Sequence, residues 1–89
     1  MADLGTFTLK PSVEYQNLAS VTGVTFESGK TYQLQIIGDA MLCEKDVKPA
    51  NGFNGFRITN DTWSFDCDGT PLWFRDASES EDFTITIAD

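Results

Sequence analysis

The sequence has no histidine, only two cysteines, and only six lysine and arginine residues in a chain of 89. Without histidine, a catalytic nucleophile would need lysine or a carboxylate as its base, and no serine lies in a nucleophile-elbow sequence. Paired carboxylates such as Asp66 and Asp68 could serve a glycosidase, but so small a domain offers little room for the cleft that this chemistry requires. We therefore expect no enzymatic activity.

The scarcity of basic residues leaves a strongly acidic chain, with fourteen aspartates and glutamates and a net charge of -8. Such a field repels phosphate backbones and anionic membrane surfaces, so we expect neither nucleic acid nor a membrane as partner. Apolar runs approaching the ~20 residues that span a bilayer are also missing, and residues 1–4 lack the pattern of a secretory signal. We expect a soluble protein that is not exported by that route.

The few soft ligands argue against metal chemistry. Cys43 and Cys67 are far apart in sequence and have no histidine to join them at a zinc site, so we expect two reduced, buried thiols. Residues 66–69, Asp-Cys-Asp-Gly, supply only a fragment of a calcium loop, even if folding brings the oxygens of Asp76 and Glu79 near. The sequence therefore predicts no bound metal and no cofactor.

The dominant feature that is present is a hydrophobic period of two, which is typical of strands with one buried face. It is clearest where Phe83, Ile85 and Ile87 share one face, and where Tyr32, Leu34 and Ile36 share another. No window has the spacing and caps of a long helix. We predict strands at residues 6–9, 21–26, 31–37, 40–44, 56–59, 62–67, 72–75 and 83–87. The chain is thus expected to be one all-β domain, residues 1–89, folded as a small antiparallel sandwich or compact barrel.

Turn signals separate these strands. Residues 27–30 predict a tight turn that joins strands 21–26 and 31–37 in a hairpin, and Gly38 is expected to end the second of these strands. Asn60-Asp61 predicts a turn between strands 56–59 and 62–67. Asp68-Gly69 is a favoured dipeptide for a hairpin turn, because glycine readily adopts positive φ, and it predicts that strands 62–67 and 72–75 pair.

The two tryptophans suggest a second interpretation. Trp63 and Trp73, with Asp66 and Asp68 near them, could stack on a pyranose ring and bind its hydroxyls. The stronger interpretation places Trp63 in the core, because it shares a face with Phe65, whereas Asp66 and Asp68 lie on the other face as solvated residues. Trp73 lies in a segment that is apolar on both faces, which must be covered by the chain's own sheet or by a partner.

Three further residues are candidates for a protein interface. Phe53 lies in a loop between glycine and asparagine, with no periodic reason to be buried, whereas Phe56 begins a strand and is expected in the core. Leu4 and Phe7 belong to residues 1–10, for which we predict an N-terminal arm that adds a strand to a partner or a sister copy. With Trp73, these residues form the predicted interface.

Several short segments together resemble small β-rich structural proteins of tailed bacteriophages. The resemblance covers residues 20–89 and is carried by Gly29-Lys30-Thr31-Tyr32, Leu42-Cys43-Glu44, Lys48-Pro49, Gly55-Phe56, Leu72-Trp73-Phe74-Arg75 and Phe83-Thr84-Ile85-Thr86-Ile87-Ala88. It implies a virion component, a capsid decoration or fibre-associated module, that is made in the host cytoplasm. Its implied partners are other virion proteins and copies of itself, and it implies neither a reaction nor a cofactor. The alternative is a small carbohydrate-binding, adhesin-like module that uses the tryptophans.

Overall fold

The computed structural model describes residues 3–78 and 81–89, which form six strands and one short helix. All strand pairs are antiparallel and belong to one sheet, which confirms the predicted all-β fold. The elements are β1 (Asp3–Leu9), β2 (Gln16–Asn17), α1 (Leu18–Thr22), β3 (Thr31–Glu44), β4 (Phe56–Asp66), β5 (Leu72–Asp76) and β6 (Phe83–Ala88).

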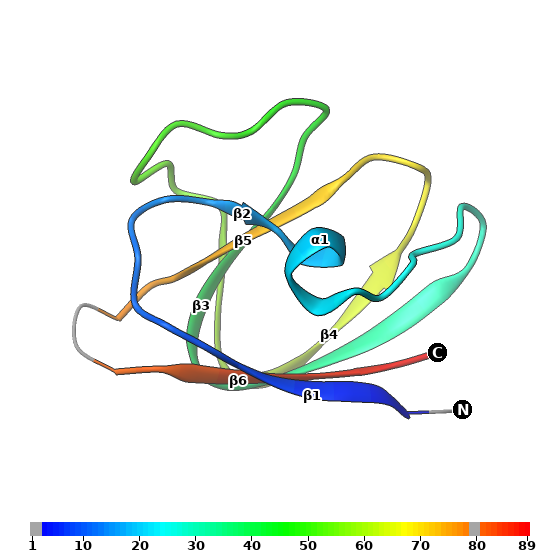
Figure 1. Ribbon diagram of the computed structural model, residues 1–89, viewed down its shortest axis with the longest axis horizontal. Helices are drawn as coiled ribbons and strands as arrows, with labels where there is room; N and C mark the ends of the chain where they lie inside the picture. Colours follow the sequence, from blue (N-terminus) through cyan, green and yellow to red (C-terminus); the bar gives the residue numbers. More distant parts are fainter. Residues whose placement is uncertain (1–2, 79–80) are drawn as a thin grey trace.

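Strand β3 is the centre of the sheet and changes partners halfway along its length. On one edge it pairs first with β6 and then with β5, while β4 follows the other edge along both halves. Strand β1 extends the sheet beyond β6, and β2 extends it beyond β5. The sheet therefore curls into a half-barrel, with β1 and β6 in one arm and β2 and β5 in the other (Figure 1).

A β-bulge lies where β3 changes partners. The register of β3 with β4 shifts between Ile36 and Asp39, and the backbone N–H of Gly38 donates to Asn60 Oδ1 at 2.8 Å. Both Gly38 (φ 114°) and Asn60 (φ 46°) have positive φ. The predictions that Gly38 ends a strand and that Asn60-Asp61 is a turn are therefore wrong. An extra residue on one strand bends a sheet without ending it, so each predicted pair of short strands is one long strand.

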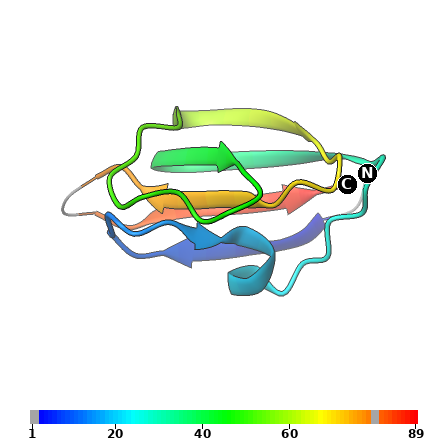
Figure 2. The ribbon, with the colours of Figure 1, turned by 90° about the horizontal axis from the view of Figure 1, so that it is seen from above.

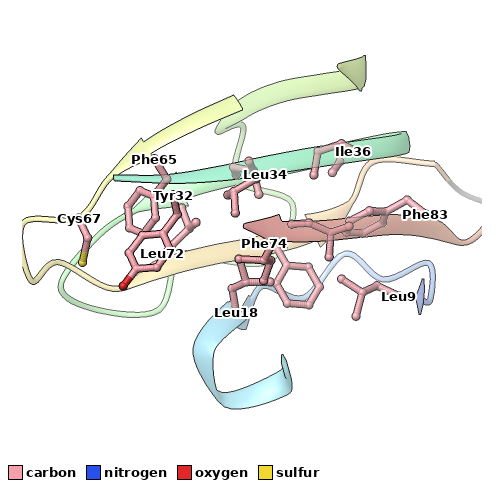
Figure 3. Packing of buried hydrophobic residues seen from close by; sticks show 14 residues of the cluster. Leu9, Leu18, Tyr32, Leu34, Ile36, Phe65, Cys67, Leu72, Phe74 and Phe83 are labelled. Carbon is pink, nitrogen blue, oxygen red and sulfur yellow. The ribbon is translucent and has the colours of Figure 1, made fainter. Parts of the chain in front are cut away.

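The core fills the concave side of the half-barrel. The predicted inward residues of β3 and β6 are confirmed, since Leu34, Ile36 and Ile85 are fully buried. Figure 3 shows Leu34 and Ile36 of β3 facing Leu18 of α1 across this core. Each fully buried side chain of this kind contributes about 1.5–3 kcal/mol of transfer free energy.

The strand predicted at residues 21–26 and its hairpin are wrong, because helix α1 takes up residues 21 and 22 and residues 23–26 form no regular element. The side chain of Asn17 accepts the backbone N–H of Ser20 at the first turn, and Gly23 ends the helix in the left-handed conformation with φ 75°. These caps favour a helical turn over the weak β pattern that follows. Figure 2 shows α1 and β4 at opposite sides of the molecule. Among the described residues, no helix has the length and apolarity needed to cross a membrane.

The hairpin predicted around Asp68-Gly69 is also wrong, although its local turn exists. Asp68 Oδ1 accepts the backbone N–H of Thr70 at 2.9 Å, and Gly69 has φ 95°. Strands β4 and β5, however, pair with opposite edges of β3, because Ala40 lies between Ile58 and Asp76. The loop therefore carries the chain from one edge of β3 to the other.

Candidate functional site

The inward side chains of β4 form a surface that is buried at one end and open at the other. We call it the inner β4 face and define it by the five residues of β4 that pair with buried residues of β3: Phe56, Ile58, Asp61, Trp63 and Phe65. Phe65 is 1% exposed, Ile58 and Trp63 are partly buried, and Phe56 is 69% exposed. Both phenylalanines lie on the same edge strand, but Phe65 belongs to the buried cluster and Phe56 lies outside it. The prediction that Phe56 belongs to the core is therefore wrong.

The aromatic rings of this face form a continuous row. The ring centroids of Phe56 and Trp63 are 6.4 Å apart, and those of Trp63 and Phe65 are 6.0 Å apart with the rings at 18°. Residues seven apart on a straight strand would not meet, so the bend at Asn60 brings Phe56 to Trp63. Offset aromatic pairs at such distances hold one another in place. The row therefore leads from the core at Phe65 to solvent at Phe56.

Acidic side chains of β4 accompany the aromatic row. Asp61 Oδ1 accepts the backbone N–H of Thr62 at 2.7 Å, and Asp66 Oδ1 accepts the hydroxyl of Thr31 at 2.7 Å. Within residues 3–78 and 81–89, no lysine or arginine forms a salt bridge with either carboxylate. Both residues are exposed. They therefore remain available to a cation from outside.

The one cation on β4 is already engaged. The guanidinium of Arg57 donates to both carboxylate oxygens of Asp39, with Nε 2.8 Å from Oδ1. Hydrogen bonding to Arg57, and secondarily to Thr59, lowers the pKa of Asp39 against the opposing effect of partial burial. Because Arg57 is paired with Asp39 of β3, it does little to neutralise the negative charges of Asp61 and Asp66 on β4.

A further carboxylate lies near the Asp66 end of β4. Burial raises the pKa of Glu44, and the negative charges of Asp68 and Asp66 raise it further. Asp68 itself has a lowered pKa, chiefly because it accepts the backbone N–H of Thr70. No group of three acidic, cysteine or histidine residues in the described part of the chain could hold a metal ion, and Glu79 lies outside that part. These carboxylates therefore act as a local negative field.

The residues predicted for sugar binding are not brought together on one platform. Trp63 is an inward residue of β4 opposite Leu34, whereas Trp73 is an outward residue of β5 opposite Cys43. The indole N–H of Trp73 donates to the carbonyl of Lys45 at 2.9 Å, so the chain itself covers part of this ring. Asp66 and Asp68 lie on the outer side of β4 and in the loop after it, as predicted for solvated residues.

Phe53 is exposed at 37%, as its loop position predicts, but its ring is not free. Lys45 Nζ lies 4.0 Å above the ring centroid, and Tyr15 packs against its edge at 6.4 Å. The hydroxyl of Tyr15 also donates to the carbonyl of Phe53 at 2.5 Å. These contacts hold the loop against the buried Tyr15, and Phe53 contributes less open apolar surface than Phe56.

The N-terminal segment forms a strand of the chain's own sheet. Strand β1 pairs with β6, so that Phe7 lies opposite Ile85 and packs against the core, while Leu4 is 37% exposed. Residues 1 and 2 lie outside the described part of the chain. Any strand added to a partner by this segment would use the edge of β1 that faces away from β6, and the arm stays a prediction.

Both cysteines are buried and free, and the predicted burial is confirmed. Burial is the main cause that raises the pKa of the Cys43 thiol. A raised pKa keeps the thiol protonated and unreactive, so Cys43 behaves as a small apolar side chain.

Sequence reasoning missed two features of the inner β4 face, the exposure of Phe56 and the inward position of Asp61, and one feature of β5, the burial of Asp76. Asp76 is only 2% exposed, and its Oδ2 has no hydrogen-bond partner among the described residues. Alternation from Trp63 would place residue 61 inward, but the assumed turn concealed that signal. No local signal distinguishes an edge strand from a central one, so the exposure of Phe56 could not be predicted.

No protein-family model, curated protein or solved structure matches the chain.

Proposed function

We propose that this chain is a non-enzymatic structural protein of a phage-like virion, a capsid decoration or fibre-associated module that acts through protein–protein contacts. Its partners are other virion proteins and copies of itself. The resemblance of residues 20–89 to phage structural proteins supports a role in a virion. The inner β4 face supports a role in protein–protein contacts.

The observation that carries the proposal is the 69% exposure of Phe56 beside the half-buried Trp63 on an edge strand. Burying an exposed phenylalanine side chain contributes about 1.5–3 kcal/mol to an association. Aromatic side chains are frequent anchors of protein interfaces when a partner covers them completely. Because Trp63 and the bend already hold the ring of Phe56 in place, a partner would order little further structure on binding.

The test uses particles purified from the source that encodes the chain. We expect mass spectrometry to find the protein in these particles in a fixed ratio to their other proteins, and Phe56→Ser to reduce its incorporation. Val47→Ser is the matched control, because Val47 is 71% exposed but lies on the loop after β3. Absence of the wild-type protein from the particles would exclude a virion role, and equal incorporation of both variants would exclude the inner β4 face as the contact.

A further inference from the structure

The open edge of β4 includes a regular segment that can accept another strand. Residues Asp61 to Asp66 pair in unbroken register with residues Ile36 to Thr31 of β3. In an antiparallel pair, the backbone groups of alternate residues point away from the partner strand. Within the described chain β4 pairs only with β3, so these groups face outward. Such an edge binds extended segments through backbone hydrogen bonds.

The side chains along this segment set the chemistry of what can bind. A strand beside β4 would bring its inward residues to Trp63 and Phe56, whose rings lie in contact at 6.4 Å. It would also bring residues next to Asp61 and Asp66, which have no salt bridge with any described residue. The negative charge of Asp66 raises the pKa of Glu44, so more than one carboxylate contributes to the negative field at this end of β4. Apolar and positively charged residues therefore complement the edge.

A second copy of this chain is a poor occupant of the same edge. If two β4 strands paired antiparallel over residues 56–66, Asp61 would lie opposite Asp61 of the other copy, and Phe56 would lie opposite Asp66. Like charges directly opposite one another destabilise a strand pair. The net charge of -8 adds repulsion between whole copies. Contacts between copies would therefore use another surface.

We propose that the segment Asp61–Asp66 of β4 binds an extended, positively charged segment of a different protein, which adds a strand to the sheet. The added strand places lysine or arginine beside Asp61 and Asp66 and an apolar side chain against Trp63. This inference rests on the proposed role in protein contacts, and it names the conformation and the charge of the partner segment.

The test is a nuclear magnetic resonance titration of the isotope-labelled protein with two synthetic peptides. One blocked eight-residue peptide has lysine at positions 2 and 7, which an antiparallel pairing places beside Asp66 on the outer side and Asp61 on the inner face, with valine at positions 3 and 5 on the side of Trp63 and threonine elsewhere. The second peptide has glutamate in place of lysine. We expect the lysine peptide to shift the amide signals of residues 61–66 and to protect them from hydrogen exchange, and the glutamate peptide to do neither. The double variant Asp61→Asn with Asp66→Asn should weaken binding of the lysine peptide about fivefold, as expected for two exposed ion pairs.

The matched control is the double variant Asp3→Asn with Asp46→Asn, which makes the same change in net charge at two other exposed positions. Its affinity should stay within about twofold of the wild type, since neither carboxylate lies on β4 and exposed charges that are not in contact are largely screened. Equal binding of the glutamate peptide, signal changes along β1 in place of β4, or equal weakening by both double variants would overturn the inference. Lack of binding by a protein that is present in virions would overturn this inference alone, whereas binding by a protein absent from virions would leave it standing without the virion role.

Discussion

Replacing the buried carboxylate of Asp76 by an amide should stabilise the protein at neutral pH. Asp76 ends β5 opposite Ala40, and one of its oxygens accepts the backbone N–H of Ser78 at 2.7 Å. The other oxygen, Oδ2, is buried without a hydrogen-bond partner in the described chain. Asp76→Asn keeps the acceptor for Ser78 and removes the charge, so it tests the cost of burying an ionised group.

The direction of the pH dependence follows from the shifted pKa. Burial raises the pKa of Asp76, and the charges of Asp39, Asp82 and Glu81 raise it further, against the opposing hydrogen bond from Ser78. The folded protein therefore holds this proton more tightly than the unfolded chain does. The resulting stabilisation is fully present below the ordinary aspartate pKa of about 3.9 and is lost as the pH rises through the raised value.

The magnitude follows from the unpaired oxygen. A buried polar group without a partner costs about 1–3 kcal/mol, and a charged group costs more. The amide leaves a neutral group at the same position, so it relieves only part of this cost. We expect Asp76→Asn to raise the free energy of unfolding by about 1 kcal/mol at neutral pH, which for a domain of this size corresponds to roughly 4–8 °C in the melting temperature.

Chemical denaturation of the wild type and the variant over a range of pH measures the effect. The advantage of Asp76→Asn should shrink as the pH falls, because the protonated acid and the amide are both neutral. Asp46→Asn controls for the change in net charge, since Asp46 is exposed. A variant that is less stable than the wild type at neutral pH, or whose advantage does not change with pH, would refute the reasoning.

Three further substitutions test the fold by the same denaturation assay. Gly38→Ala should lower the free energy of unfolding by about 3 kcal/mol, because φ is 114° at Gly38 and a Cβ there would lie 2.7 Å from Cβ of Phe83. A loss below about 1 kcal/mol would contradict the backbone conformation described for the bulge. Asn17→Ala removes the N-cap of α1 and should lower the free energy of unfolding by about 1 kcal/mol, whereas Asn51→Ala in an exposed loop should leave it almost unchanged. Equal effects of the two substitutions would show that the side chain of Asn17 does not stabilise the helix. Leu34→Ala should cost about 2–5 kcal/mol because Leu34 is fully buried, and a near-neutral result would place it outside the core.

Most of the strand positions could be predicted because alternation is a local property of the chain. Side chains at successive strand positions point to opposite faces, so Phe83, Ile85 and Ile87 identify both a strand and its buried side. The same rule identified Tyr32, Leu34 and Ile36 of β3. Where several turn signals competed with alternation, the local interpretation failed, as it did at Gly38 and Asn60.

The candidate surface was less accessible to such reasoning. Phe56 has the same local pattern as the buried Phe83, but Phe83 belongs to the buried cluster on a strand between two others, whereas Phe56 lies outside that cluster on an edge strand. The sequence likewise predicts that Asp76 belongs to a solvated acidic connection, but Asp76 is buried because it lies on the concave side of β5. The exposure of Phe56 and of Asp76 depends on which strands lie beside them, and those strands are distant in sequence.

The sequence by itself determined the fold class, the acidic charge and the inward face of most strands, because composition and alternation act within a few residues. The tertiary structure alone decided which strands are neighbours, that β3 and β4 continue through a bulge, and that β4 has an open edge with Phe56 exposed beside Trp63. The physical reason is that strand pairing depends on backbone hydrogen bonds between segments far apart in the chain, and every residue carries those groups whatever its side chain.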